Sequence, residues 1–297
     1  MKFLSCLPSS ISFLAIFLSL NNLLPVKPGF AENINPISTS LDALNLQLPF
    51  PNQDDLDREV CDRTIESSID LIIQRSELKN GKWAILVQSL GGTNIYSLNP
   101  DSYMVPASNI KLLVTAAALQ KLDPNGTIYS TSITDWIKVT NLKSNNAYAN
   151  LLLRHLGGSQ SVNQALSNLG VDTNGYRLKD GSGLSRNNLA TPRTLVSTLR
   201  AMYHAKGNEV FLASLPVAGI SGTLKNRMRH TTAEGAVRAK TGTLKGVKAL
   251  SGYLNSPEYG VVVFSIITNQ ANDLASFAAV RAIDEIVLQL SNPKKCR

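Results

Sequence analysis

The sequence has few of the residues that most often build metal sites and histidine-based catalytic sites. Its 297 residues include only three histidines and three cysteines. His155, His204 and His230 form no cluster with a metal-ligand spacing, and no cysteine has a metal-ligand neighbour. The Gly-x-Ser-x-Gly elbow of histidine-based α/β hydrolases is also missing. We therefore expect no metal and no cofactor, and a histidine-based serine hydrolase is disfavoured.

Long hydrophobic runs are equally scarce. The one candidate is the apolar segment 11–20, which follows Lys2 and precedes the small residues of Gly29-Phe30-Ala31. This pattern is typical of a secretory signal, predicted here over residues 1–31. A retained membrane anchor is the alternative, but a bilayer span needs about 20 apolar residues. We expect export to the periplasm or cell-wall space, with no membrane span in the mature chain.

Removal of the signal would leave two cysteines, Cys61 and Cys296, one near each end of the mature chain. A pair of cysteines in an oxidising compartment is a disulfide candidate. The alternative is two unpaired thiols. Both remain open from the sequence.

Acidic residues are outnumbered, 21 against 29 basic ones. The formal charge is +8, and it falls to +6 if Lys2 and Lys27 leave with the signal. A basic exported protein suits an acidic polymer such as the cell wall, although solubility alone would also explain the charge. Basic and aromatic residues do not alternate as in nucleic-acid-binding segments, so no nucleic-acid partner is expected.

Hydrophobic patterning predicts a flexible leader over 32–54 and a folded domain over 55–297. The expected elements are a helix, two strands, a helical middle region, three strands and a closing helix. This order predicts an α+β fold: a five-stranded antiparallel sheet flanked by helices (about 55–107 and 216–297), with a helical lobe alongside (about 108–215). The ranges of the expected elements are 56–76, 83–90, 94–99, 108–122, 144–215, 236–242, 247–254, 260–268 and 274–290.

Three short motifs follow one another along the domain. They are Ser108-x-x-Lys111, Ser144-Asn145-Asn146 and Lys240-Thr241-Gly242. Ser-x-x-Lys is weak by itself, since it recurs at Ser76 and Ser291, and Ser108 could simply cap a helix. The ordered trio, on a helix, a helix start and a strand, indicates acyl transfer by an active-site serine.

The chemistry requires these residue types. Positions three apart share one face of a helix, so Lys111 can accept the Ser108 proton, provided that it is a neutral amine. Burial and a second cation, Lys240, would lower its pKa. The backbone N–H groups of Ser108 and Thr243 are candidates for binding the oxyanion. Gly242 would let substrate lie close to the strand.

The motifs and their flanks resemble the serine D-Ala-D-Ala carboxypeptidase/endopeptidases typified by penicillin-binding protein 4. The resemblance covers about 80–268 and implies the penicillin-recognising serine hydrolase fold. Its flanks are ASNIKLLVTAAAL, VTNLKSNNAYANLLLRHLGG, LKDGSGLSRNNLATPRTLV, LPVAGISGTLKNRM and AVRAKTGTLKGVKALSGYL.

The resemblance also implies a role for each residue. Ser108 would be the nucleophile and Lys111 its base, with Ser144 relaying a proton to the leaving amine and Lys240 supplying positive potential. Asn146 would hold the substrate amide. Thr241 and Thr243 would bind the terminal carboxylate beside Gly242, and Asp180 and Ser182 would be structural support.

The implied activity is D-alanyl-D-alanine carboxypeptidase, with endopeptidase action as a second possibility, on peptidoglycan stem peptides, and with acylation by β-lactams. We expect a monomer. Two departures concern substrate placement: only 35 residues separate Ser108 from Ser144, where the family usually carries two inserted domains, and Asn150 replaces a frequent glutamate.

Two other functions remain as alternatives. A serine β-lactamase would need a base for deacylation, yet the only glutamates between Ser144 and Lys240 are Glu209 and Glu234, outside any recognisable motif. A non-catalytic module that senses β-lactams or binds the cell wall is the other, and the intact nucleophile and base positions argue against it.

Overall fold

The computed structural model describes residues 64–270 and 273–291. These residues belong to one compact unit, Pro51–Arg297. The predicted signal, the predicted leader and the two cysteines of the possible disulfide, Cys61 and Cys296, lie outside the described residues.

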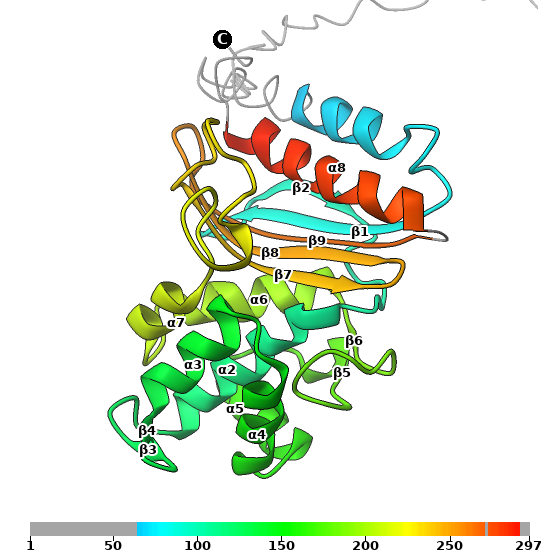
Figure 1. Ribbon diagram of the computed structural model, residues 1–297. Coiled ribbons are helices and arrows are strands. Elements are labelled where there is room, and N and C mark those ends of the chain that lie inside the picture. The colour runs from blue at the N-terminus through cyan, green and yellow to red at the C-terminus, as the bar shows by residue number, and fades with distance from the viewer. Residues whose placement is uncertain (1–63, 271–272, 292–297) are drawn as a thin grey trace, which may run out of the picture. The chain divides into compact units, whose positions relative to one another are not determined.

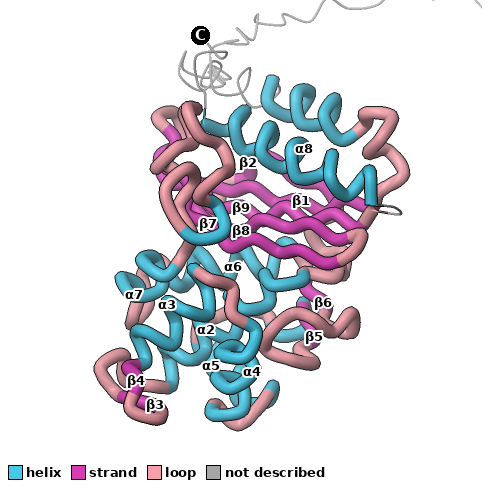
Figure 2. The backbone as a smooth tube through the Cα atoms, in the orientation of Figure 1, coloured by secondary structure: helices cyan, strands magenta, loops and turns pink. Residues whose placement is uncertain are grey.

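A five-stranded antiparallel sheet forms the centre of this unit (Figures 1 and 2). Its spatial order is β2-β1-β9-β8-β7, so the first hairpin and the last three strands combine into one sheet. The predicted fold class is confirmed. The strands are β1 (Lys82–Ser89), β2 (Asn94–Leu98), β7 (Val237–Leu244), β8 (Val247–Ser256) and β9 (Gly260–Asn269).

Both faces of the sheet are covered, which explains why its central strands are almost continuously apolar. Helix α8 (Asp273–Ser291) and the helix at 64–73 cover one face. Their core includes the four isoleucines whose spacing predicted the first helix. On the opposite face, α6 (Pro192–Met202) packs against the sheet, and α2 (Ile110–Lys121) belongs to the same buried core.

Helix α2 is the centre of the helical region. Ten of its twelve residues are buried, and a helix that is apolar on all sides is expected to lie inside a protein. Other helices surround it (Figure 1). They are α3 (Ile133–Leu142), α4 (Asn146–His155), α5 (Ser159–Asn168) and α7 (Asn208–Ser214). The short elements are η1 (Ala107–Asn109), η2 (Thr173–Gly175), η3 (Gly222–Leu224), β3 (Thr127–Ile128), β4 (Thr131–Ser132), β5 (Tyr176–Arg177) and β6 (Leu189–Ala190).

Helix α3 is absent from the expected elements. It has its own signals, since Ser132 caps it by accepting a hydrogen bond from the Asp135 N–H, and Ile133, Trp136 and Ile137 lie on one buried face. This helix ends just before Ser144 and so helps to set the position of the second motif.

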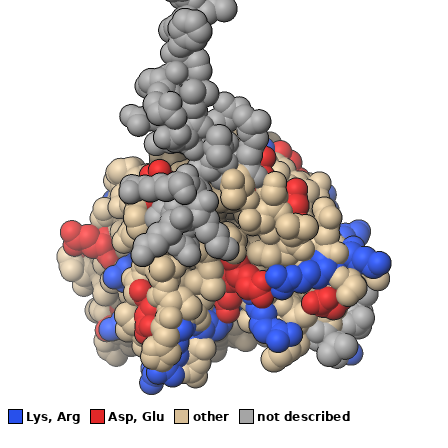
Figure 3. Space-filling view, turned by 90° about the horizontal axis from the view of Figure 1, so that it is seen from above, with Lys and Arg blue, Asp and Glu red and all other residues tan. Residues whose placement is uncertain are grey.

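The surface seen in Figure 3 carries interspersed basic and acidic side chains over its described part. No described helix combines the length and the apolar character that a bilayer crossing demands.

Candidate active site

Ser108 lies in the short 3-10 turn η1 that leads into α2, one turn before Lys111. Glycines on both sides allow the neighbouring segments to pack closely against this turn. A Cβ on Gly242 would lie 2.6 Å from the Pro106 carbonyl oxygen, and a Cβ on Gly183 would lie 2.1 Å from that of Ala107. The nucleophile candidate is therefore clamped between β7 and the loop after β5. The N-cap of α2 is Asn109, so Ser108 does not cap this helix.

Lys111 is completely buried and points its amine at the Ser108 hydroxyl. Its Nζ lies 2.7 Å from Ser108 Oγ and 2.9 Å from Asn146 Oδ1, and it also donates to the Ser182 carbonyl oxygen. Burial lowers the pKa of Lys111 to about 8, although the nearby Asp180 carboxylate acts in the opposite direction. The amine can thus lose its proton near neutral pH, as a general base requires.

Lys240 reaches across from β7 to the second motif. Its Nζ donates to Ser144 Oγ at 2.8 Å and to the Thr241 carbonyl oxygen at 3.0 Å. The side chain is fully buried, and burial followed by repulsion from Lys111 lowers its pKa. We expected burial and a second cation to lower the pKa of Lys111. Burial lowers it, and the repulsion between the two lysines lowers the pKa of Lys240.

The loop that contains Asp180 and Ser182 completes the surroundings of the nucleophile. Asp180 Oδ1 accepts hydrogen bonds from the Ser182 N–H, the Ser182 hydroxyl and the Gly183 N–H, at 2.7–2.8 Å, and Oδ2 accepts from the Ser185 N–H at 2.8 Å. Burial would raise the pKa of Asp180, but these hydrogen bonds outweigh it and lower the pKa. The loop is therefore fixed, with its Ser182 carbonyl oxygen 3.3 Å from Ser108 Oγ.

Two asparagines of α4 join this network. Asn146 Oδ1 accepts a hydrogen bond from the Lys111 amine, and the side-chain nitrogen of Asn146 takes no part in this bond. Asn150, at the position where the family often has glutamate, accepts a hydrogen bond from the Ser182 N–H at 3.0 Å. The neutral side chain therefore supports the same loop that Asp180 holds.

The free edge of β7 faces the cleft. One edge of β7 pairs with β8. At the opposite edge, which faces the cleft, the Ala239 N–H donates to the Pro216 carbonyl oxygen. Alternate residues of an antiparallel strand turn their N–H groups to the same edge, so those of Thr241 and Thr243 also point outward. This orientation suits the expected part of Thr243 in binding an oxyanion.

These residues line one cleft of about 400 Å³. The motif residues Ser108, Ser144, Asn146, Thr241 and Thr243 are all among its walls, and Gly242, Lys111 and Lys240 lie directly behind them. Reasoning from motifs missed several of the lining residues, because they lie outside the three motifs in loops, in helices or at the end of β7. These are Gly183, Leu184, Thr223, Arg227, Leu244 and Val280.

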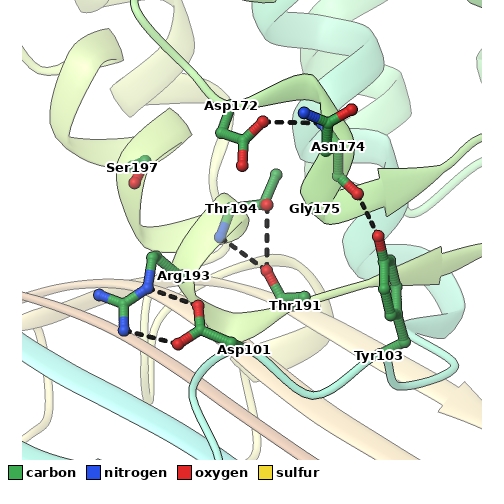
Figure 4. Close-up of a pocket in the computed structure, with 9 residues that line it drawn as sticks. All are labelled: Asp101, Tyr103, Asp172, Asn174, Gly175, Thr191, Arg193, Thr194 and Ser197. Carbon is green, nitrogen blue, oxygen red and sulfur yellow. Dashed lines mark hydrogen bonds and ion pairs between the residues drawn. The ribbon is translucent and has the colours of Figure 1, made fainter.

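A second, smaller pocket of about 220 Å³ contains none of the motif residues (Figure 4). Several of its polar side chains contact one another: Arg193 forms a bidentate ion pair with Asp101, and the Thr191 hydroxyl donates a hydrogen bond to the Thr194 hydroxyl. Tyr103 donates to a backbone carbonyl oxygen on its rim. The pocket is therefore a weaker candidate than the cleft. Among the described residues, no group of three His, Cys, Asp or Glu side chains could hold a metal ion.

Solved structures with the same fold include a penicillin binding protein and β-lactamases. Penicillin binding protein 4 from Haemophilus influenzae, in complex with a β-lactam, matches with a TM-score of 0.66 and 15% identity over 76% of this chain and 99% of that chain. A class A β-lactamase from Clostridium kluyveri matches with a TM-score of 0.61 and 16% identity over 77% and 97%. At this identity the likeness concerns the fold alone.

Sequence relatives are more specific. The D-alanyl-D-alanine carboxypeptidase of Actinomadura sp. (strain R39) is 47% identical over 156 residues, which are 47% of this chain and 29% of that protein. Penicillin-sensitive carboxypeptidase A of Dictyostelium discoideum is 34% identical over 186 residues, 55% and 35% of the two chains. The matches thus span about a third of these relatives. The model of the D-Ala-D-Ala carboxypeptidase 3 (S13) family matches residues 65–135 and 127–290, and the chain belongs to this family.

Proposed function

We propose that this protein is a D-alanyl-D-alanine carboxypeptidase that cleaves peptidoglycan stem peptides through an acyl-enzyme on Ser108. The observation that carries the proposal is the buried Lys111 amine, 2.7 Å from Ser108 Oγ and with a pKa lowered to about 8. Family membership and the named carboxypeptidase relatives support the same reaction.

In the proposed acylation, neutral Lys111 accepts the hydroxyl proton while Ser108 Oγ attacks the carbonyl carbon of the penultimate D-alanine. The N–H groups of Ser108 and Thr243 bind the oxyanion. Breaking the C–N bond requires a proton on the leaving amine. Ser144 passes its hydroxyl proton to the amine and receives in its place the proton that Lys111 took from Ser108. Lys240, 2.8 Å away, holds the Ser144 hydroxyl in position. Water then hydrolyses the ester and releases the shortened peptide.

Substrate binding would use the outer edge of β7 and the far wall of the cleft. Asn146 binds a substrate amide through its side-chain nitrogen, since its oxygen accepts from Lys111. Thr241 and Thr243 bind the terminal carboxylate. Gly242 leaves space between the strand and η1, where any side chain would collide with the Pro106 carbonyl oxygen.

The same site would react with β-lactams but release them slowly. Rapid deacylation needs a base beside the ester, and none of the described residues that line the cleft is aspartate or glutamate. Glu234 accepts from the His230 N–H, and Glu209 is exposed on α7. These observations favour the carboxypeptidase over the β-lactamase alternative.

We also propose the organisation given by the sequence pattern: a signal over 1–31, a leader over 32–54 and a peptidase domain over 55–297, exported to the periplasm or cell-wall space as a monomer. The disulfide between Cys61 and Cys296 is part of this proposal. Thiol counting of the denatured, secreted protein before and after reduction tests it: two free thiols without reductant would contradict the bond.

The activity is tested by release of D-alanine from a diacyl-D-Ala-D-Ala peptide. The wild-type protein should release D-alanine, and Ser108→Ala should release none above the uncatalysed rate. Ser76→Ala is the matched control, because Ser76 starts another Ser-x-x-Lys sequence in an exposed turn. Equal release by wild type and Ser108→Ala would remove Ser108 from the mechanism.

A further inference from the structure

The far wall of the cleft carries two residues that belong to none of the three motifs. Thr223, in η3, and Arg227, just after it, line the cleft together with Thr241 and Thr243. Thr223 Oγ1 and Thr241 Oγ1 are 2.7 Å apart. The hydrogen bond between the two hydroxyl groups uses one of their two protons, so the other O–H can donate to a ligand.

Arg227 is held from behind by α8. Its Nε and Nη2 donate to Asp284, at 3.0 Å and 2.5 Å from Oδ1, in a pair whose side chains are only 18% and 20% exposed. Its backbone is fixed as well, because the Gly219 N–H donates to the Arg227 carbonyl oxygen. The ion pair does not use Nη1, so the edge formed by Nη1 and Nη2 is the part of the guanidinium that can receive a second carboxylate.

The charges of the lining residues favour an anion at this wall. Arg227 is the one lysine or arginine among the described lining residues, and aspartate and glutamate are missing from them. A carboxylate fits the donors, since hydroxyl groups and a guanidinium edge both bind its oxygens.

We propose that Arg227 and Thr223 bind the carboxylate of the leaving D-alanine together with Thr241 and Thr243, and that Asp284 is the positioning residue that orients Arg227. The inference rests on the proposed function and deepens it. It makes the far wall a determinant of specificity: the enzyme distinguishes a free C-terminal carboxylate from an esterified or amidated one at this wall.

Two thioester substrates test the inference. They carry the same acyl-D-alanyl group, and the leaving group is thioglycolate in one and thioglycolate methyl ester in the other. Both form the same acyl-enzyme on Ser108. Each kcat/KM is divided by the rate of alkaline hydrolysis of that thioester, because the two thiols differ in acidity, and the ratio of the normalised values then reports on the leaving carboxylate. The wild-type enzyme is expected to favour the free carboxylate.

Arg227→Gln should lower kcat/KM for the free carboxylate about 10- to 100-fold, the range of hydrogen bonds to a charged group, and change that of the methyl ester less than about twofold. Asp284→Asn and Thr223→Val should shift the ratio in the same direction by less. Arg75→Gln is the matched control, because Arg75 pairs with Glu285, the next residue of α8, and does not line the cleft. This variant should leave the ratio unchanged.

An equal loss on both thioesters in Arg227→Gln, with Arg227→Lys no better, would assign Arg227 a structural role and overturn the inference. Equal normalised kcat/KM values for both thioesters in the wild-type enzyme would overturn it too. Failure of the wild-type protein to form an acyl-enzyme with either thioester would instead refute the proposed function, on which the inference rests.

Discussion

The protonation state of Lys111 predicts how the rate of acylation depends on pH. Burial places its pKa near 8, below the usual value of 10.5. With this pKa, about a tenth of the Lys111 side chains are neutral at pH 7, and an unperturbed lysine would be about 0.03% neutral. Burial therefore increases the population of the active base at pH 7 about 300-fold.

The assay is the second-order rate constant for acylation by penicillin, measured by rapid mixing between pH 6 and pH 10. Penicillin carries no group that titrates in this range, so the profile reports on the protein. The rate constant should increase about fivefold from pH 7 to pH 8 and less than twofold from pH 8 to pH 9, as follows from a single base with a pKa of about 8.

Lys79→Met is the control, because Lys79 stands three residues after Ser76 in the other Ser-x-x-Lys sequence and is exposed. Its profile should match that of the wild-type protein. A rate constant that does not change between pH 6 and pH 9, or that keeps rising tenfold per unit up to pH 10, would refute the assignment of Lys111 as a base activated by burial.

Three further changes have defined outcomes. Lys111 has a pKa of about 8 in the folded protein and near 10.5 when unfolded, so its burial costs about 3 kcal/mol at pH 7, a cost that disappears as the pH rises above 10. Lys111→Met should therefore abolish acylation and raise the free energy of unfolding at pH 7 by about 1–3 kcal/mol in denaturant titrations; a lower free energy would contradict this. Gly183 has a φ of 86° and no space for a Cβ, so Gly183→Ala should lower the free energy of unfolding by about 1–3 kcal/mol and slow acylation. An unchanged melting temperature and acylation rate would contradict the close packing around η1. Ser144→Ala should slow acylation by penicillin about 10²- to 10⁴-fold without removing the adduct, whereas a wild-type rate would exclude Ser144 as the proton donor.

The sheet and the central helix were predictable because their residues alternate or repeat with the period of the element they form. Strands β8 and β9 are largely apolar, and β7, β8 and β9 lie within two residues of the expected bounds. Helix α3 was missed although Ser132 and its apolar spacing mark it.

The motif residues of the site were predictable because the chemistry fixes their types and spacing. The pairs Ser108–Lys111 and Ser144–Lys240 are in contact as expected. The rest of the cleft depends on how distant segments pack. The Ser182 carbonyl oxygen is a backbone atom that any residue could supply, and Arg227 enters the cleft only because Asp284, 57 residues later, holds it there.

The most direct test of the central claim is to locate the penicillin adduct by peptide mass spectrometry. The adduct should be found on the peptide that contains Ser108, at one equivalent per chain, and should be lost in Ser108→Ala. An adduct on Ser76 or Ser291, or one that persists in Ser108→Ala, would contradict the claim that the hydroxyl beside the Lys111 amine is the nucleophile.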